Sequence, residues 1–279
     1  MSSLICFRPK QVEEAREHNS PDLDLSDRSI SKLVDIPGLF TLKNLTRLTL
    51  SHNKLDAVPP HMIELTSLET LNLFNNYIEE LPTNLSSMQN LKHLSIGMNR
   101  LYALPRGFGS FPKLEILDAS YNNLTENSLP GNFFLLETLR ALYLSDNDFE
   151  IIPEDIGQLT KLEVLALRDN QLIALPKAIG DLPKLKELHI QGNRLTVLPP
   201  ELGKLDLYSG NTALKAENNP WVPPIASQFQ VGVSHVFEYI RSETYKFLYG
   251  RHVQAGAAPP PKTNSNAKKT SRREVWGKK

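Results

Sequence analysis

The stretch that decides the fold is Leu68-Glu69-Thr70-Leu71-Asn72-Leu73-Phe74-Asn75-Asn76, which follows the pattern L-x-x-L-x-L-x-x-N. Seven copies of this pattern occur, and they end on Asn53, Asn76, Asn99, Asn122, Asn147, Asn170 and Asn193. These asparagines are 23 residues apart, except that 25 residues separate Asn122 from Asn147. A fixed period of this length predicts a solenoid, in which one structural unit is stacked on the next.

Two further sets of residues keep the same register. A proline follows each asparagine, at Pro59, Pro82, Pro105, Pro130, Pro153, Pro176 and Pro199. An apolar residue follows each proline, at Met62, Leu85, Phe108, Phe133, Ile156, Ile179 and Leu202. Proline fixes φ and lacks an N–H, so it ends the strand and starts the return segment, whose apolar residue packs back on the leucines.

The leucines alternate with period two inside each copy, as in a strand with one buried face. We expect the leucines to point inward and the variable positions to point out. The asparagine amide, with donors and an acceptor, suits the backbone groups where the chain leaves the strand. The chain resembles the leucine-rich repeat proteins over about residues 20–222. That resemblance implies an α/β solenoid with a curved, parallel sheet on its concave face, short helical or irregular returns on its convex face, and helical caps.

The ends of the chain differ from the repeats. We predict an N-terminal cap and degenerate first repeat over 1–40, repeats over 41–213, a C-terminal cap over 214–252 and a disordered basic tail over 253–279. Short helices are expected at Val12–His18 and Ile225–Tyr249. The run ending in Asn219-Pro220-Trp221 is similar to the start of the C-terminal cap of extracellular leucine-rich repeat proteins, with Trp221 as a structural residue. Such caps carry cysteines, whereas Cys6 is the single cysteine here, which favours a reducing compartment.

Charge is unevenly distributed along the chain. The 31 basic and 31 acidic residues balance, which argues against a protein built as a whole to bind nucleic acid. The tail, however, carries seven Lys or Arg and one Glu, so it is about +6 and the rest is about −6. Lys268, Lys269, Arg272 and Arg273 suit either a nuclear-import or phospholipid-binding patch or a solubilising tail. No apolar stretch is long enough to span a membrane, and we expect no membrane insertion.

The sequence offers no arrangement typical of an enzyme. Glycine-rich nucleotide loops, a nucleophile elbow and paired metal-binding histidines are absent. Asp146, Asp148 and Asp169 could attract a cation, but we interpret them as acidic turn residues of a solenoid. We therefore expect a non-catalytic protein without cofactor or metal.

The variable positions of the predicted strands are then the candidate binding surface. Phe74, Met98, Tyr121 and Tyr143 place large side chains in adjacent repeats, with Arg168 and Asp169 beside them, and such residues often dominate binding. The alternative is that the aromatic residues only cover their neighbours within the sheet. The candidate partner-binding residues on the concave face are Phe74, His93, Met98, Asp118, Tyr121, Tyr143, Asp146, Arg168, Asp169 and His189.

A closer resemblance extends over about residues 10–252. The long repeat Asn122–Phe133, the segments Leu142–Glu150 and His189–Leu195, and the run Lys215–His252 are similar to the Ras suppressor protein family. The first ten residues and the tail match less well, which indicates a divergent, invertebrate-like member.

This family resemblance implies a cytoplasmic adaptor at cell–matrix adhesions. It implies binding to the last LIM domain of the adaptor PINCH, and thereby a link to integrin-linked kinase and parvin, with effects on Ras and Jun-kinase signalling. On its own the chain is expected to be a monomer. The alternative is a regulatory scaffold, similar to those that recruit a phosphatase or a Ras or Raf component, although the short basic-Val-x-Phe docking motif of such scaffolds is absent.

Overall fold

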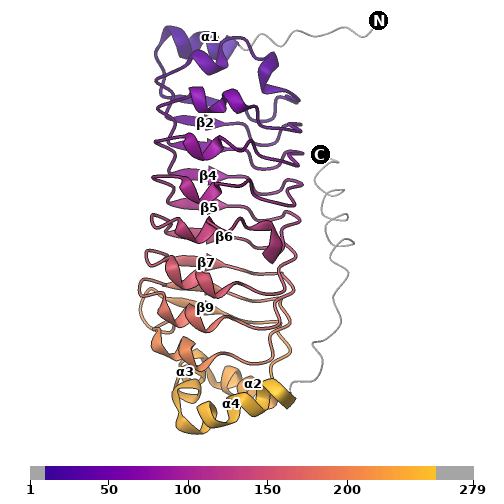
Figure 1. Ribbon diagram of the computed structural model, residues 1–279, viewed down its shortest axis with the longest axis vertical. Helices are drawn as coiled ribbons and strands as arrows, with labels where there is room; N and C mark the ends of the chain where they lie inside the picture. Colours follow the sequence, from indigo (N-terminus) through magenta and orange to yellow (C-terminus); the bar gives the residue numbers. More distant parts are fainter. Residues whose placement is uncertain (1–9, 256–279) are drawn as a thin grey trace, which may run out of the picture. The chain divides into compact units, whose positions relative to one another are not determined.

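The computed structural model describes residues 10–255, which form two compact units (Figure 1). The first unit comprises 10–123 and 127–142, and the second comprises 124–126 and 143–255. Residues 1–9, with Cys6, and residues 256–279, with nearly all of the predicted tail, lie outside the described residues.

The first unit is built on short parallel strands that follow one another in chain order. They are β1 (Asp22–Asp24), β2 (Arg47–Thr49), β3 (Thr70–Asn72), β4 (His93–Ser95) and β5 (Ile116–Asp118). Equivalent leucines face each other across this sheet, with Leu48 opposite Leu71 and Leu71 opposite Leu94. Strand β6 (Ala141–Tyr143) lies where the chain passes between the units.

The second unit repeats this arrangement. Its strands are β7 (Val164–Ala166), β8 (Glu187–His189) and β9 (Ala213–Lys215), again parallel and in chain order. The register between β8 and β9 pairs Leu188 with Leu214, which are 26 residues apart rather than 23. The extra residues lie in the return segment between the two strands. The predicted leucine-rich repeat solenoid with parallel strands is confirmed in both units.

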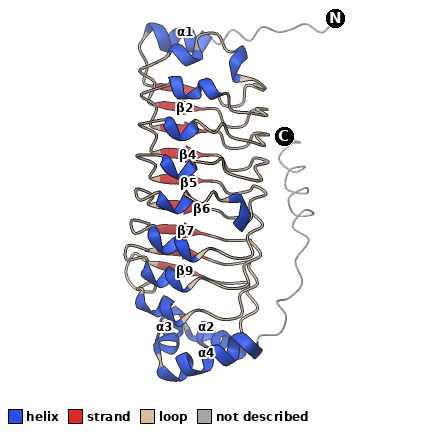
Figure 2. Ribbon diagram, in the orientation of Figure 1, coloured by secondary structure: helices blue, strands red, loops and turns tan. Residues whose placement is uncertain are grey.

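The return segments contain short 3-10 helices (Figure 2). In several repeats the proline of the repeat pattern directly precedes such a helix, as Pro59, Pro153, Pro176 and Pro199 do. These helices are η1 (Leu33–Asp35), η2 (Leu39–Thr41), η3 (Pro60–Glu64), η4 (Leu85–Ser87), η5 (Phe108–Ser110), η6 (Glu126–Ser128), η7 (Phe133–Leu135), η8 (Glu154–Gln158), η9 (Lys177–Asp181) and η10 (Pro200–Lys204).

The core of each unit consists of the inward leucines and the apolar return residues. Leu48, Leu71 and Leu165 are fully buried, and so are Met62 and Leu202 from the return segments. Removing such side chains from water is the main stabilising contribution, at about 25 cal/mol for each square ångström of apolar surface. One repeat alone could not bury its leucines, so each repeat folds only when it is stacked on its neighbours.

Both ends carry helices. Helix α1 (Lys10–Glu17) buries Val12 and Ala15 beside β1. At the other end the single helix expected over Ile225–Tyr249 is three helices: α2 (Pro223–Val231), α3 (Val233–Arg241) and α4 (Glu243–Ala255). Gly232, with φ of 152°, ends α2, and extended Ser242 ends α3. Breaking the helix lets the apolar residues of three separate segments turn toward one core, and α4 continues past the expected boundary at residue 252.

Candidate functional site

The side-chain amides of the repeat asparagines bond to backbone groups in a recurring pattern. In Asn76, Nδ2 donates to the carbonyl oxygens of Leu50 and Leu73, both at 3.0 Å, and Oδ1 accepts from the N–H of Leu55 at 3.0 Å. One amide thus satisfies backbone groups of its own repeat and of the preceding one. These side chains are buried and hold the strand ends, so they support the surface rather than form it.

Asn219 continues this ladder at the C-terminal cap, although the sequence pattern changes there. Its Nδ2 donates to Ile190 at 2.9 Å and its Oδ1 accepts from the N–H of Leu195 at 3.1 Å. Trp221 donates from Nε1 to the carbonyl of Ala216 at 3.1 Å and packs beside Phe229. The Asn-Pro-Trp motif contained this signal, but Asn219 was absent from the predicted structural residues.

In the first unit, two predicted binding residues meet over a glycine. A side-chain carbon at Gly97 would lie 3.1 Å from Cδ2 of Phe74 and 3.1 Å from Oδ2 of Asp118. The absence of a side chain at Gly97 therefore makes room for the Phe74 ring and the Asp118 carboxylate. Asp118 also accepts from the backbone N–H of Ser120 at 3.0 Å, which fixes the direction of its carboxylate. We call Phe74, Gly97 and Asp118 the Phe74 cluster.

Met98 and Tyr121 lie beside the strands rather than on them. Both have left-handed backbones, with φ of 55° and 57°, and this holds for every residue that directly precedes a ladder asparagine from His52 to Gly192. Side chains other than Gly, Asn and Asp rarely adopt this conformation, which costs about 1–2 kcal/mol. Met98 and Tyr121 are therefore turn residues at the edge of the strand face, half-buried in the first unit. His93 is exposed on β4.

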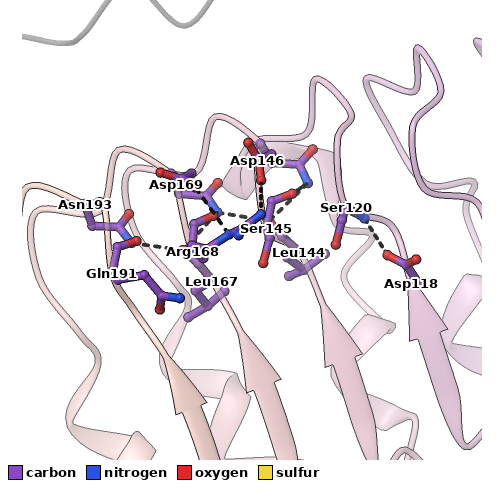
Figure 3. Close-up of polar contacts among 12 residues, drawn as sticks. Asp118, Ser120, Leu144, Ser145, Asp146, Leu167, Arg168, Asp169, Gln191 and Asn193 are labelled. Atoms are coloured by element: carbon purple, nitrogen blue, oxygen red, sulfur yellow. Dashed lines mark hydrogen bonds and ion pairs between the residues drawn. The ribbon is translucent and has the colours of Figure 1, made fainter. Parts of the chain in front are cut away.

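In the second unit, Arg168 joins the two predicted acids. Its Nη2 lies 2.9 Å from Oδ2 of Asp146, and its Nε lies 3.2 Å from Oδ2 of Asp169 (Figure 3). The Asp146 side chain is only 8% exposed, so Arg168 neutralises a nearly buried carboxylate. We call these three residues the Arg168 cluster. Tyr143, half-buried, belongs to the same unit.

His189 lies on β8 of the second unit, separate from the ion pairs of Arg168. Its Nε2 is 3.3 Å from Oε2 of Glu187. Burial lowers the pKa of His189, and the positive charge of Lys215 lowers it further, while Glu187 opposes both. His189 is thus held neutral at physiological pH and is suited to hydrogen bonding rather than to an ion pair. Glu187 and Lys215 were not predicted as site residues, although Glu187 stands in a variable strand position.

Neither a metal-binding cluster nor a membrane-spanning helix is present in the described part of the chain. Among residues 10–255, no group of three or more His, Cys, Asp or Glu side chains could hold a metal ion. Within the same residues, no helix is long and apolar enough to cross a membrane.

Comparison with known families identifies the repeat. Models described as leucine-rich repeat region, leucine rich repeat, and leucine rich repeats in two copies match residues 108–209, 66–124 and 43–87. Among solved structures, an internalin from Listeria monocytogenes has a TM-score of 0.62 at 24% identity, covering 74% of this chain and 58% of that one. The Arabidopsis receptor kinase HAESA, solved with a peptide hormone and a co-receptor, has a TM-score of 0.61 at 28% identity, covering 74% of this chain and 35% of its own.

Whole-length relatives are far more similar. Ras suppressor protein 1 from Bos taurus is 70% identical, and that from Mus musculus is 68% identical, each over 96% of this chain and 97% of the relative. Ras suppressor protein 1 from Homo sapiens is 71% identical over the same share of both chains. With the repeat register, the long fourth repeat and the C-terminal motif all present, this chain belongs to the Ras suppressor protein family of leucine-rich repeat proteins.

Proposed function

We propose that this protein is a non-catalytic adaptor that binds the last LIM domain of PINCH through the strand face. By this face we mean the Phe74 cluster with Met98, Tyr121 and His93 in the first unit, and the Arg168 cluster with Tyr143 and His189 in the second. The observation that carries the proposal is the 71% identity to human Ras suppressor protein 1 over 96% of the chain. The proposal includes an indirect link to integrin-linked kinase and parvin at cell–matrix adhesions in the cytoplasm, and a Ras-related signalling role.

The chemistry of the strand face supports a protein partner. Phe74 and Tyr143 are half-buried aromatic side chains, a type enriched among residues that dominate protein interfaces. The left-handed turns at Met98 and Tyr121 give a second argument. Bulky side chains there carry a backbone cost that asparagine would avoid, and such strain is typical of positions kept for function.

A binding measurement tests the strand face. We expect Phe74→Ala and Tyr143→Ala each to weaken binding to a PINCH C-terminal LIM fragment about tenfold, because truncating a central aromatic residue typically costs more than 1 kcal/mol. Titration calorimetry on the full chain measures this. Arg168 is left intact, because its removal would strand the buried Asp146 carboxylate and confuse binding with folding.

The matched control is Tyr102→Ala, since Tyr102 is 53% exposed and lies on a loop outside the strands. It should bind as the unchanged protein does. If Phe74→Ala and Tyr143→Ala both keep full affinity while circular dichroism shows them folded, the strand face is not the binding site.

A further inference from the structure

The C-terminal cap of the second unit borders an open cavity that the proposed function does not use. Its volume is about 550 Å³, and it lies among η9, η10, α3 and α4. Four basic side chains line it, together with one acid and one phenol: Lys177, Lys204, Arg241, Lys246, Glu201 and Tyr249. Asp181, Glu243 and Glu154 lie beside the lining residues Lys204, Lys246 and Tyr249, so a ligand must compete with these carboxylates for the lysines. The four cations that line the cavity itself face one lining carboxylate, and this arrangement favours an anionic ligand.

Arg241 builds the cavity wall. Its Nε donates to the carbonyl of Gly203 at 2.6 Å, and its Nη2 donates to the carbonyl of Leu205 at 3.0 Å. A side-chain carbon at Gly203 would lie 3.0 Å from Cγ of Arg241, so glycine permits this close approach of α3 to η10. Arg241 thus contributes a fixed positive charge, while the lysines are the groups that can contact a ligand.

The three lysines differ in how readily their ammonium groups can contact a ligand in the cavity. Lys204 pairs with Asp181 at 2.7 Å, and Lys246 pairs with Glu243 at 2.8 Å. Both pairs are solvent-exposed, and exposed pairs typically contribute less than about 1 kcal/mol, so a phosphate can replace the partner. Lys177 makes no ion pair with any described residue, and its ammonium group is the one left to the cavity.

Glu201 adds a second requirement. Its Oε2 is buried and has no hydrogen-bond donor among the described groups. Tyr249, which also lines the cavity, has a pKa raised by burial and by the charges of Glu201 and Glu154, so it stays a neutral phenol. A ligand that carried only negative charge would leave this carboxylate unpaired at a cost. A ligand with both phosphates and hydroxyl groups would satisfy the lysines and Glu201 together.

Helix α4 shows apolar side chains to solvent next to this cavity. Phe247 is 71% exposed and Val253 is 51% exposed. Val253 follows Lys246 and Tyr249 by seven and four residues, so all three share one side of the helix. Exposed apolar side chains beside basic ones are typical of a surface that lies in a bilayer interface.

We propose that the C-terminal cap binds anionic bilayers that contain phosphoinositides. The phosphorylated inositol headgroup occupies the cavity, with its phosphates on Lys177, Lys204 and Lys246 and a hydroxyl group on Glu201. Phe247 and Val253 enter the interface of the bilayer. This peripheral binding is independent of the strand face and of its partner.

Vesicle co-sedimentation of the full chain tests the proposal. Three vesicle types are compared: phosphatidylcholine alone, phosphatidylcholine with a minor fraction of phosphatidylinositol bisphosphate, and phosphatidylcholine with enough phosphatidylserine to match that charge. We expect strong binding only to the phosphoinositide vesicles. We expect a double variant, Lys177→Glu with Lys246→Glu, to lose at least about tenfold in affinity, since each basic residue near an anionic surface contributes about fivefold.

The matched control is Lys161→Glu with Lys184→Glu, two exposed lysines of the same unit that do not line the cavity. It should retain the preference for phosphoinositide vesicles. Phe247→Ser should weaken vesicle binding, because the contact of this side chain with the bilayer is lost. Its affinity for soluble inositol hexakisphosphate should stay unchanged, because the cavity is intact.

Three outcomes would overturn the proposal. Equal binding to the charge-matched phosphatidylserine vesicles would show that charge alone attracts the chain. Loss of all phosphoinositide preference on removal of residues 256–279, with the cavity intact, would assign recognition to the tail. Binding of soluble inositol hexakisphosphate without binding to any vesicle would make the cavity a site for a free ligand rather than a bilayer.

Discussion

At the scale of single residues, the side-chain amides of the repeat asparagines connect the backbones of neighbouring repeats. Asn122 is fully buried, and its Nδ2 donates to the carbonyls of Ile96, Ala119 and Ser120 at 3.0 to 3.2 Å. Its Oδ1 accepts from the N–H of Leu101 at 3.0 Å. One side chain thus completes four backbone groups that water cannot reach.

We therefore expect Asn122→Ala to lower the free energy of unfolding by about 1–3 kcal/mol, because the buried N–H of Leu101 loses its acceptor, while the carbonyls of Ile96 and Ser120 keep Asn99 and Met98 as donors. Urea denaturation measures this. Asn127→Ala is the matched control, since Asn127 is exposed, and it should change stability by less than about 0.5 kcal/mol. Equal stability of the two variants would contradict a structural role for the ladder.

The residue scale also separates surface positions that look alike in sequence. Arg168 and Asp118 both stand in variable positions of the repeat, yet both already have partners in their own unit. Arg168 neutralises Asp146, while Asp118 caps the N–H of Ser120. A partner protein must therefore compete with or add to these bonds, which makes Phe74 and Tyr143 cleaner positions for binding tests.

At the scale of elements, the C-terminal cap is secured by a tyrosine. Tyr245 on α4 is fully buried; its hydroxyl donates to the carbonyl of Leu198 at 2.6 Å and accepts from the N–H of Leu198 at 3.3 Å. Burial raises the pKa of the Tyr245 phenol, so the hydroxyl remains a donor. The helix is thereby fastened to the return segment of the last full repeat.

We expect Tyr245→Phe to lower the free energy of unfolding by about 1–3 kcal/mol, because both backbone groups of Leu198 lose their partner. Differential scanning calorimetry measures the shift. Tyr239→Phe provides the comparison, since Tyr239 lies half-buried on α3 and stacks beside Tyr245. If the two variants melt alike, the hydroxyl of Tyr245 has no special role in docking α4.

At the scale of the whole molecule, a solenoid needs its ends covered. Each repeat contacts only its neighbours, so the last repeat would expose its leucines without a cap. Here α2, α3 and α4 provide that cover through buried Ile225, Val236, Phe237, Ile240 and Tyr245. The cap therefore has a structural task as well as the proposed bilayer contact.

A chain that ends at Val222 should expose the apolar end of the repeats and associate. We expect it to bind the dye ANS and to scatter light at concentrations where a chain that ends at Ala255 does neither, since exposed apolar patches of this kind drive aggregation. A chain that ends at Ala255 keeps all three helices and is the control. A monomeric, dye-free protein ending at Val222 would show that the repeats need no C-terminal cap.

Much of the architecture follows from periodicity alone. The 23-residue register predicts the strands, the buried leucines and the return segments, because each depends on residues at fixed places in one repeat. The breaks at Gly232 and Ser242 were not predicted, because an amphipathic stripe does not reveal where a helix stops when spacings of three to five residues are allowed. The left-handed turns at Met98 and Tyr121 escaped prediction, because neither residue favours that backbone by itself.

The sequence by itself determined the repeat, the inward face, the asparagine ladder and the family, because these arise from patterns that neighbouring repeats enforce on one another. Only the tertiary structure decided how surface side chains combine. It joined Arg168 to Asp146, opened room for Phe74 at Gly97, and placed Lys177, Lys204 and Lys246 around one cavity. The physical reason is that such groupings depend on the lateral distance between repeats and on the packing of the cap. Neither of these leaves a periodic signal in the sequence.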